Sequence, residues 1–203
     1  ITSGDNCMQR IGFTEHGLPH AKRSSNYARD ILQALDYPSR TCELAAIAGY
    51  MHDIGNIINR VDHAHSGGVM AFQILSKLNM PPEEIVLVSS SIGHHDEKTA
   101  YPVNEVAAAL ILSDKTDVRR SRVRKDALLD IDIHDRVNYA VEKSSFKINK
   151  DDMTAIFKIT IDTNICPVME YFEIFIDRMV LCRKSADYLK LQFELIVNDI
   201  RLL

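Results

Sequence analysis

A histidine next to a carboxylate, His52-Asp53, follows a strongly apolar stretch of the chain. Because the apolar residues recur at helical spacing, we expect the pair to leave the end of a buried helix and point inward. An unpaired buried carboxylate costs several kcal/mol, and no Lys or Arg lies in 41–59. We therefore expect the positive partner of Asp53 to be a metal ion that histidines from other helices hold. The apolar residues are Leu44, Ile47, Ala48 and Met51.

Further histidines and one carboxylate stand near the ends or inner faces of five successive predicted helices. A single buried histidine is more often a hydrogen-bonded core residue, but seven such groups together favour a metal site. Imidazole nitrogens and carboxylate oxygens suit Mn, Fe, Co, Ni or Zn, and Mg is also compatible. A carboxylate can bridge two ions, so the set is large enough for two. The candidate metal ligands are His20, His52, Asp53, His65, His94, His95 and Asp114.

Five helices must position these side chains, and hydrophobic periodicity predicts them in the first half of the chain. The first two span about 20–36 and 41–54. A loop containing His63 and His65 leads into the third, and Pro81-Pro82 opens the fourth, which ends at Gly93. Asn104 caps the fifth, on which Asp114 follows the inner face. The inner face expected for the third helix consists of Val69, Met70, Ile74, Leu75 and Leu78.

Beyond about residue 127 the pattern changes to alternation, which predicts a β-hairpin over about 137–161. A helix over 167–188 and a last strand over 191–197 follow. The predicted fold is mainly α: a helical metal-binding domain (1–127), then a small α+β domain (128–203) with a three-stranded sheet and one helix. Its free sheet edges favour pairing with a second copy, so we expect a homodimer, and the unit could also cover the site.

Composition limits the function classes. The 203 residues are 46% hydrophobic and 26% charged, which is typical of a globular protein. A net charge of −4 argues against general nucleic-acid binding. No apolar run is long enough for a membrane span. The four cysteines show no framework spacing, so we expect reduced thiols and a cytoplasmic protein.

The order His20, His52-Asp53, Asp114 resembles the His, His-Asp, Asp signature of the HD-domain metal-dependent phosphohydrolase superfamily, over about the first 125 positions. The resemblance implies an all-helical fold. The extra histidines resemble two-metal members, including the HD-GYP branch that hydrolyses cyclic dinucleotides. On this likeness His20, His52, Asp53 and Asp114 hold one ion. Asp53 bridges to a second ion, which is held by His65, His94 and His95.

The chain departs from these relatives at two points. Many members read His-Asp-x-Gly-Lys, but Asn56 stands at the lysine position, so a phosphate contact expected there is missing. Of the Gly-Tyr-Pro motif only Tyr101-Pro102 remains, and cyclic di-GMP is therefore not the expected substrate.

A basic run, 115–125, follows Asp114 directly. On composition alone it would be a solvated helix end. Its position instead suggests that Lys115 and either Arg119 or Arg122 bind substrate phosphate, with Asp117 orienting them. Glu15 and His16 are weaker candidates at the mouth of the site. His63 is assigned to a loop and His134 lies outside the site.

The expected reaction is hydrolysis of a phosphate ester or anhydride in a small nucleotide-like substrate, by water activated between two divalent ions at Asp53. Lys115 and an arginine would stabilise charge on the phosphoryl oxygens. His94, His95 or Asp96 would carry a proton to the leaving group. Two alternatives remain. One is a di-iron oxygenase, because the ligands also resemble those of a small branch of the superfamily that holds two irons and activates oxygen. The other is a regulatory module that binds metal and nucleotide without turnover.

Overall fold

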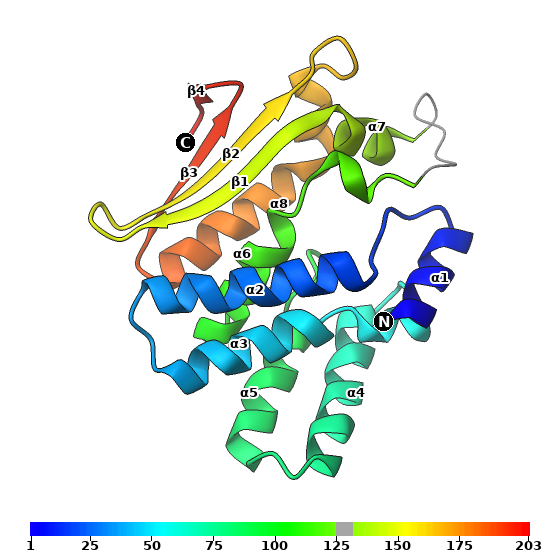
Figure 1. Cartoon of the computed structure of the whole chain (residues 1–203), viewed down its shortest axis with the longest axis vertical. Coiled ribbons are helices and arrows are strands. Elements are labelled where there is room, and N and C mark those ends of the chain that lie inside the picture. The colour runs from blue at the N-terminus through cyan, green and yellow to red at the C-terminus, as the bar shows by residue number, and fades with distance from the viewer. Residues whose placement is uncertain (125–131) are drawn as a thin grey trace.

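The computed structural model describes residues 1–124 and 132–203. The predicted domain boundary at 127/128 and Lys125 lie outside the described residues. The fold is mainly helical, with one small sheet near the C-terminus (Figure 1). The helices are α1 (Thr2–Arg10), α2 (Leu18–Ala34), α3 (Ser39–Met51), η1 (Ile54–Ile57), α4 (His63–Lys77), α5 (Pro82–Gly93), α6 (Glu105–Lys115), η2 (Arg120–Arg122), α7 (Ile133–Ala140) and α8 (Val168–Tyr188). The strands are β1 (Val141–Asn149), β2 (Thr154–Ile161), β3 (Gln192–Val197) and β4 (Ile200–Arg201).

Helix α6 lies at the centre of the molecule. Its residues 106–115 are all buried, and it packs against α2, α3, α5 and α8. A helix that is apolar on every side has no solvent face to offer, so the sequence itself directs α6 to the middle. The predicted cap is confirmed, because Asn104 Oδ1 accepts a hydrogen bond from the Ala107 N–H at 2.7 Å. Asp114 is thereby fixed at the end of the most buried helix.

Helices α2 and α3 approach each other closely at Gly49. A methyl group added there would lie 2.7 Å from the Ser24 carbonyl oxygen, closer than van der Waals contact allows. Small residues on α3, Ala45 and Ala48, are also fully buried. This close packing brings the start of α2, which carries His20, beside the end of α3, which carries His52.

Gly55, in η1, has no room for a side chain. A Cβ atom there would lie 2.0 Å from the His63 carbonyl oxygen, in the first turn of α4. We expect Gly55→Ala to lower the free energy of unfolding by about 3 kcal/mol or more, because backbone atoms must move apart. Urea unfolding followed by circular dichroism measures this. Gly93→Ala is the matched control, since nothing lies within 4 Å of its added methyl; equal stability of the two variants would contradict the expectation.

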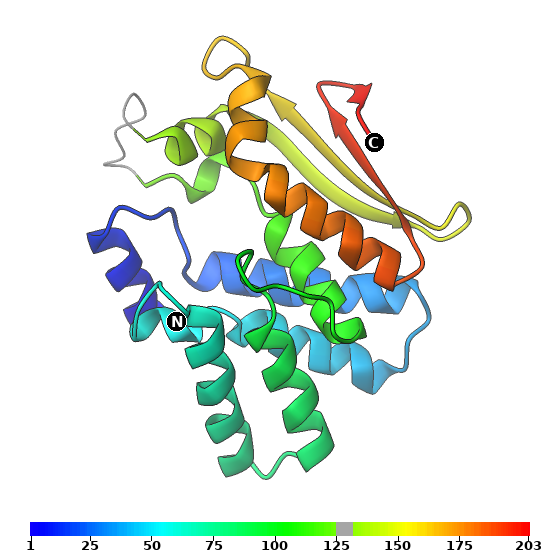
Figure 2. The same cartoon turned by 180° about the vertical axis from the view of Figure 1, so that it is seen from behind.

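The sheet has the order β1-β2-β3-β4. β1 and β2 form an antiparallel hairpin, β2 and β3 are parallel, and β3 and β4 are antiparallel. Parallel neighbours need a crossover, and α8 supplies it, lying along one face of the sheet (Figures 1 and 2). α8 also packs on α6. One continuous set of buried apolar residues therefore runs from α2 to β3.

Two predictions about the C-terminal unit were wrong in detail. The alternation at Val137 and Tyr139 belongs to α7 rather than to a strand, and β1 begins only at Val141. Asp132 starts α7, because its carboxylate accepts the N–H groups of His134 and Asp135. The sheet has four strands rather than three among the described residues, since the two-residue β4 pairs with β3.

In the described ranges no helix is both long and apolar enough to cross a membrane. The cysteines Cys7, Cys42, Cys166 and Cys182 are free thiols, and all but Cys7 are buried.

Candidate metal centre

Four buried histidines converge on one region from α2, α3, α4 and the end of α5. In each ring Nδ1 faces an oxygen that can only accept a hydrogen bond, so Nδ1 carries the hydrogen. The other nitrogen, Nε2, then presents a lone pair. This is the arrangement in which histidine binds metals. The Nδ1 partners are Asp117 Oδ2 for His20 (2.7 Å), Gly49 O for His52 (2.8 Å), Arg60 O for His63 (3.0 Å) and Ile92 O for His95 (2.7 Å).

The first donor group joins His20, His52, Asp53 and Asp114. Nε2 of His20 lies 3.1 Å from Nε2 of His52 and 3.2 Å from Asp114 Oδ1. Asp53 Oδ2 lies 3.3 Å from Nε2 of His52 and 3.7 Å from that of His20. Ligands at about 2.1 Å from an ion are about 3.0 to 3.4 Å apart in octahedral or tetrahedral geometry. His20, His52 and Asp114 are thus close enough together to hold one ion, and Asp53 lies beside them, 3.7 Å from Nε2 of His20.

The second donor group adjoins the first through Asp53. Its other oxygen, Oδ1, lies 3.5 Å from Nε2 of His63, which is 3.2 Å from Nε2 of His95. Donor atoms of His52, Asp53 and His95 also lie within 4.8 Å of one another. Arg60 Nη1 is close by, 3.3 Å from Nε2 of His63 and 3.6 Å from Asp53 Oδ1. Asp53 therefore faces both donor groups, one with each carboxylate oxygen.

The donor set fits a cation on two observations. Asp53 Oδ2 is buried and accepts no hydrogen bond from any described residue. In addition, neutral His20 and His52 would direct two lone pairs at each other across 3.1 Å, which is repulsive without a positive charge between them. These buried His and Asp groups could hold a metal ion.

The electrostatics favour the ionisation states that bind metals. Burial opposes the charge of both carboxylates, but His52 for Asp53, and Lys115 for Asp114, hold the pKa of each well below its usual range. Burial lowers the pKa of His95 strongly and that of His63 as well. These two histidines therefore stay neutral while the carboxylates stay ionised at pH 7.

His52 differs from His63 and His95 in the direction of its pKa shift. Burial would lower its pKa, but the charges of Asp53 and Asp114 outweigh burial and raise it. The two carboxylates thus draw a proton toward the place where a metal ion would bind.

The structure brings five predicted ligands together, His20, His52, Asp53, His95 and Asp114. It does not bring His65, whose side chain is 56% exposed and lies beside Asp62. The prediction that His63 is a loop residue was also wrong: it begins α4 and is 2% exposed. His63 occupies the place expected for His65.

The inner face predicted for α4 was also largely wrong. Among the large apolar residues, Val69, Ile74 and Leu78 are exposed and only Leu75 is buried. The buried face is made of small residues, because α4 packs closely on α5 and η1. That face consists of His63, Ala64, Gly67, Gly68, Ala71 and Leu75.

His94 is half-buried, and its Nδ1 lies 2.9 Å from the Ser90 carbonyl oxygen. It belongs to neither donor group of the described residues. Asp96 lies in the wall of the adjoining cavity. His134, predicted to lie outside the site, also lines that cavity, and its side chain is 57% exposed.

The residues predicted to bind substrate phosphate lie close to the donor groups, but they already form ion pairs and hydrogen bonds with other residues of the protein. Lys115 is buried, with Nζ 2.7 Å from Asp114 Oδ2 and 3.5 Å from Glu97. Burial would lower its pKa, but Asp114 and Glu97 raise it, so Lys115 is charged. Asp117 binds His20 on one side and the Arg119 guanidinium on the other, at 2.8 Å. Asp117 therefore orients a predicted ligand as well as an arginine.

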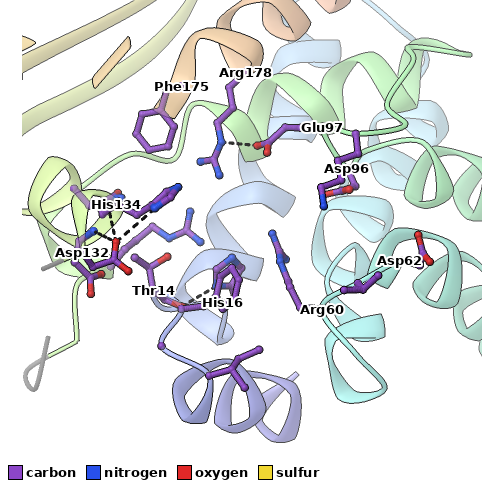
Figure 3. A pocket seen from close by; sticks show the side chains of 18 of the residues that line it. Thr14, His16, Arg60, Asp62, Asp96, Glu97, Asp132, His134, Phe175 and Arg178 are labelled. Carbon is purple, nitrogen blue, oxygen red and sulfur yellow. Dashed lines mark hydrogen bonds and ion pairs between the residues drawn. The ribbon is translucent and has the colours of Figure 1, made fainter. Parts of the chain in front are cut away.

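A cavity of about 600 Å³ (Figure 3) adjoins the donor groups through Arg60, a lining residue whose Nη1 is 3.6 Å from Asp53 Oδ1. His16, whose ring packs edge-on against that of His20, and Arg60 form its inner wall. Asp96 and Glu97, after α5, and Phe175 and Arg178, from α8, form the opposite side. A cavity of this size accommodates a small organic ligand.

The charged wall residues Arg60, Glu97 and Arg178 were not among the predicted site residues. No spacing in the sequence links the three, because they come from separate elements that meet only in the folded chain.

A scan against models of protein families finds no match for this chain, and a search of curated proteins finds no similar sequence.

Proposed function

We propose that this protein is a metal-dependent phosphohydrolase of the HD type, which cleaves a phosphate ester or anhydride in a nucleotide-like substrate. The observation that carries the proposal is the pair of donor groups joined at Asp53 beside a cavity lined by arginines. A site that holds two neighbouring cations is suited to phosphoryl transfer, because the cations can neutralise the charge on both the attacking and the leaving oxygen.

The residues that would hold one ion are His20, His52, Asp53 and Asp114. Asp53, His63 and His95 would hold the second. Such ions supply Lewis acidity and lower the pKa of water to near 7, which makes hydroxide available at neutral pH. Mn, Fe, Co, Ni and Zn all suit this donor set.

The protein's own groups would position the substrate and handle protons. His16 donates from Nδ1 to the Thr14 carbonyl oxygen at 2.7 Å, which leaves Nε2 as an acceptor in the cavity wall. Burial holds the pKa of His16 well below its usual range, so the ring stays neutral and Nε2 could accept a hydrogen bond from the attacking water and orient it. Of the three predicted proton donors, His94, His95 and Asp96, only Asp96 lines the cavity. We therefore propose that Asp96 carries the proton to the leaving group. Lys115 would keep Asp114 ionised and correctly oriented.

The test is metal analysis of protein purified without chelator, followed by phosphate-release assays on nucleoside mono-, di- and triphosphates and dinucleotides. We expect two metal equivalents per chain and hydrolysis that stops after chelation and returns with Mn or Co. Two irons with oxygen uptake and no phosphate release would instead favour an oxygenase. Bound metal and nucleotide without turnover would favour a regulatory module, and a metal-free protein would contradict the proposal.

A further inference from the structure

The arginines near the donor groups differ in how many of their N–H groups are already used. Arg122 donates from Nε and Nη2 to the Glu15 carbonyl oxygen and from Nη1 to that of Asp117. Arg119 donates to Asp117, Ser121 and Glu15. Their hydrogen bonds hold the loop after α6 against the segment before α2. These two arginines therefore have few donors left for a substrate.

Arg60 and Arg178 are different. Arg60 makes its hydrogen bonds to described residues through Nη1 alone, and Arg178 reaches Glu97 through Nε. No Nη atom of Arg178 donates a hydrogen bond within the part of the chain that the structure describes. Figure 3 shows the two guanidinium groups entering the cavity from opposite sides. Each has unused, forked N–H donors of the kind that bind phosphate oxygens.

Arg178 is held in place by its neighbours. Its guanidinium lies over the Phe175 ring, 4.4 Å from the ring centre, and Nε is paired with Glu97. Glu97 also faces Lys115, and the two cations hold its pKa below the usual range although burial opposes this. Glu97 therefore orients the guanidinium of Arg178 through Nε and leaves both of its Nη atoms directed away from this ion pair.

The two arginines are connected to the donor groups in different ways. Arg60 is next to Asp53 itself, 3.6 Å away. Arg178 is connected to Asp114 only through Glu97 and Lys115, across contacts of 3.5 and 2.7 Å. A phosphate beside the donor groups would contact Arg60 and leave Arg178 unsatisfied. A second phosphate linked to the first would extend outward along the cavity toward Arg178.

We infer that Arg60 and Arg178 bind two successive phosphate groups, so that the substrate class is a nucleoside di- or oligophosphate rather than a monophosphate. The inference rests on the proposed function and defines its substrate. It also makes α8 part of the active site, because the outer phosphate is bound from the C-terminal half of the chain.

The test is calorimetric binding of methylenediphosphonate, which is not hydrolysed, and of orthophosphate to the metal-loaded protein. We expect the diphosphonate to bind the wild type at least about 10-fold more tightly, since one charged hydrogen-bonding partner is worth about 10-fold or more. Arg178→Gln should remove this preference and change orthophosphate affinity less than about twofold. Arg60→Gln should weaken both ligands. Arg183→Gln, an exposed arginine of α8 outside this cavity, is the matched control.

A second measurement uses the wild-type protein alone. Phenylglyoxal modifies arginines, and mass spectrometry of peptides identifies which ones react. Methylenediphosphonate should protect Arg178, whereas orthophosphate should protect Arg60 only. Equal protection by the two ligands would overturn the inference, and so would an Arg178→Gln variant that loses stability but keeps the diphosphonate preference. In that case Arg178 serves only to hold Glu97.

The outcomes separate this inference from the proposed function. Nucleotide hydrolysis with no diphosphonate preference would leave the phosphohydrolase standing and remove the role of Arg178. A preference for methylenediphosphonate over orthophosphate that depends on Arg178, without hydrolysis of any nucleotide, would establish the two-phosphate site. It would also contradict the proposal that the protein is a phosphohydrolase.

Discussion

Replacing Asp53 by asparagine is expected to abolish hydrolysis, with a loss of at least about 1,000-fold, and to reduce bound metal to less than one equivalent per chain. Asp53 faces both donor groups, with Oδ2 3.3 Å from His52 and Oδ1 3.5 Å from His63. An amide carries no charge and has one oxygen, so it cannot serve both. Metal analysis and a phosphate-release assay on the same preparation measure the two effects.

The control for this variant is Asp30→Asn, which removes an exposed carboxylate on α2. It should keep two metal equivalents and the wild-type rate. Circular dichroism verifies that Asp53→Asn is folded, so that loss of metal is not a consequence of unfolding. A folded Asp53→Asn protein with two bound ions and normal turnover would rule out the bridging role of Asp53.

The second prediction concerns two histidines that are two residues apart. His63→Ala should lose one of two metal equivalents and lower the rate by about 100-fold or more, because even the loss of a group that merely supports a ligand costs 10- to 100-fold. His65→Ala should keep both ions and stay within about twofold of the wild-type rate, since its side chain is 56% exposed and lies beside Asp62 rather than at the donor groups.

The two substitutions are chemically identical, so each serves as the control for the other. Metal content by mass spectrometry and the rate of phosphate release decide between them. Loss of the ion in His65→Ala but not in His63→Ala would contradict the prediction. It would mean that His65 rather than His63 belongs to the second donor group, and that α4 begins in a different conformation.

The choice between these histidines could not be made from periodicity alone. Successive helix residues are rotated by about 100°, so positions two apart point to nearly opposite sides. Which of the two faces inward depends on where the helix begins. Asp62, with φ of 58°, turns the chain immediately before α4 and sets that start. Such a left-handed aspartate is not evident from composition or spacing.

The small residues of α4 indicate its buried face better than its large apolar residues do. Gly67 lies one turn after His63, and its added methyl would be 3.2 Å from the His52 carbonyl oxygen. Small residues mark the closest approach between helices, and the spacing 63, 67, 71 identifies the buried face correctly. Hydrophobic size does not identify that face, because exposed positions such as Val69 and Leu78 carry large apolar side chains too.

The helices that position His20, His52 and Asp114 were predictable because their apolar periodicity and caps agree with the fold. The wall formed by α8 was not predictable. Its position follows from the parallel pairing of β2 with β3, a contact between residues almost 40 positions apart that local pattern does not encode. Arg178 therefore approaches Glu97 only as a result of the topology of the whole sheet.

The inward-facing lone pairs also tie the folding equilibrium to the supply of ions. In the proposed metal-loaded state, a bound ion removes the repulsion between the inward-facing lone pairs of the folded protein. The unfolded chain has no comparable binding site. Binding to the folded state alone adds RT ln(1 + [L]/Kd), or about 2.7 kcal/mol when the free ion is at 100 times its dissociation constant. The midpoint of thermal unfolding thus becomes a measure of metal availability, and a cell that withdraws these ions would change both the activity of this protein and its lifetime.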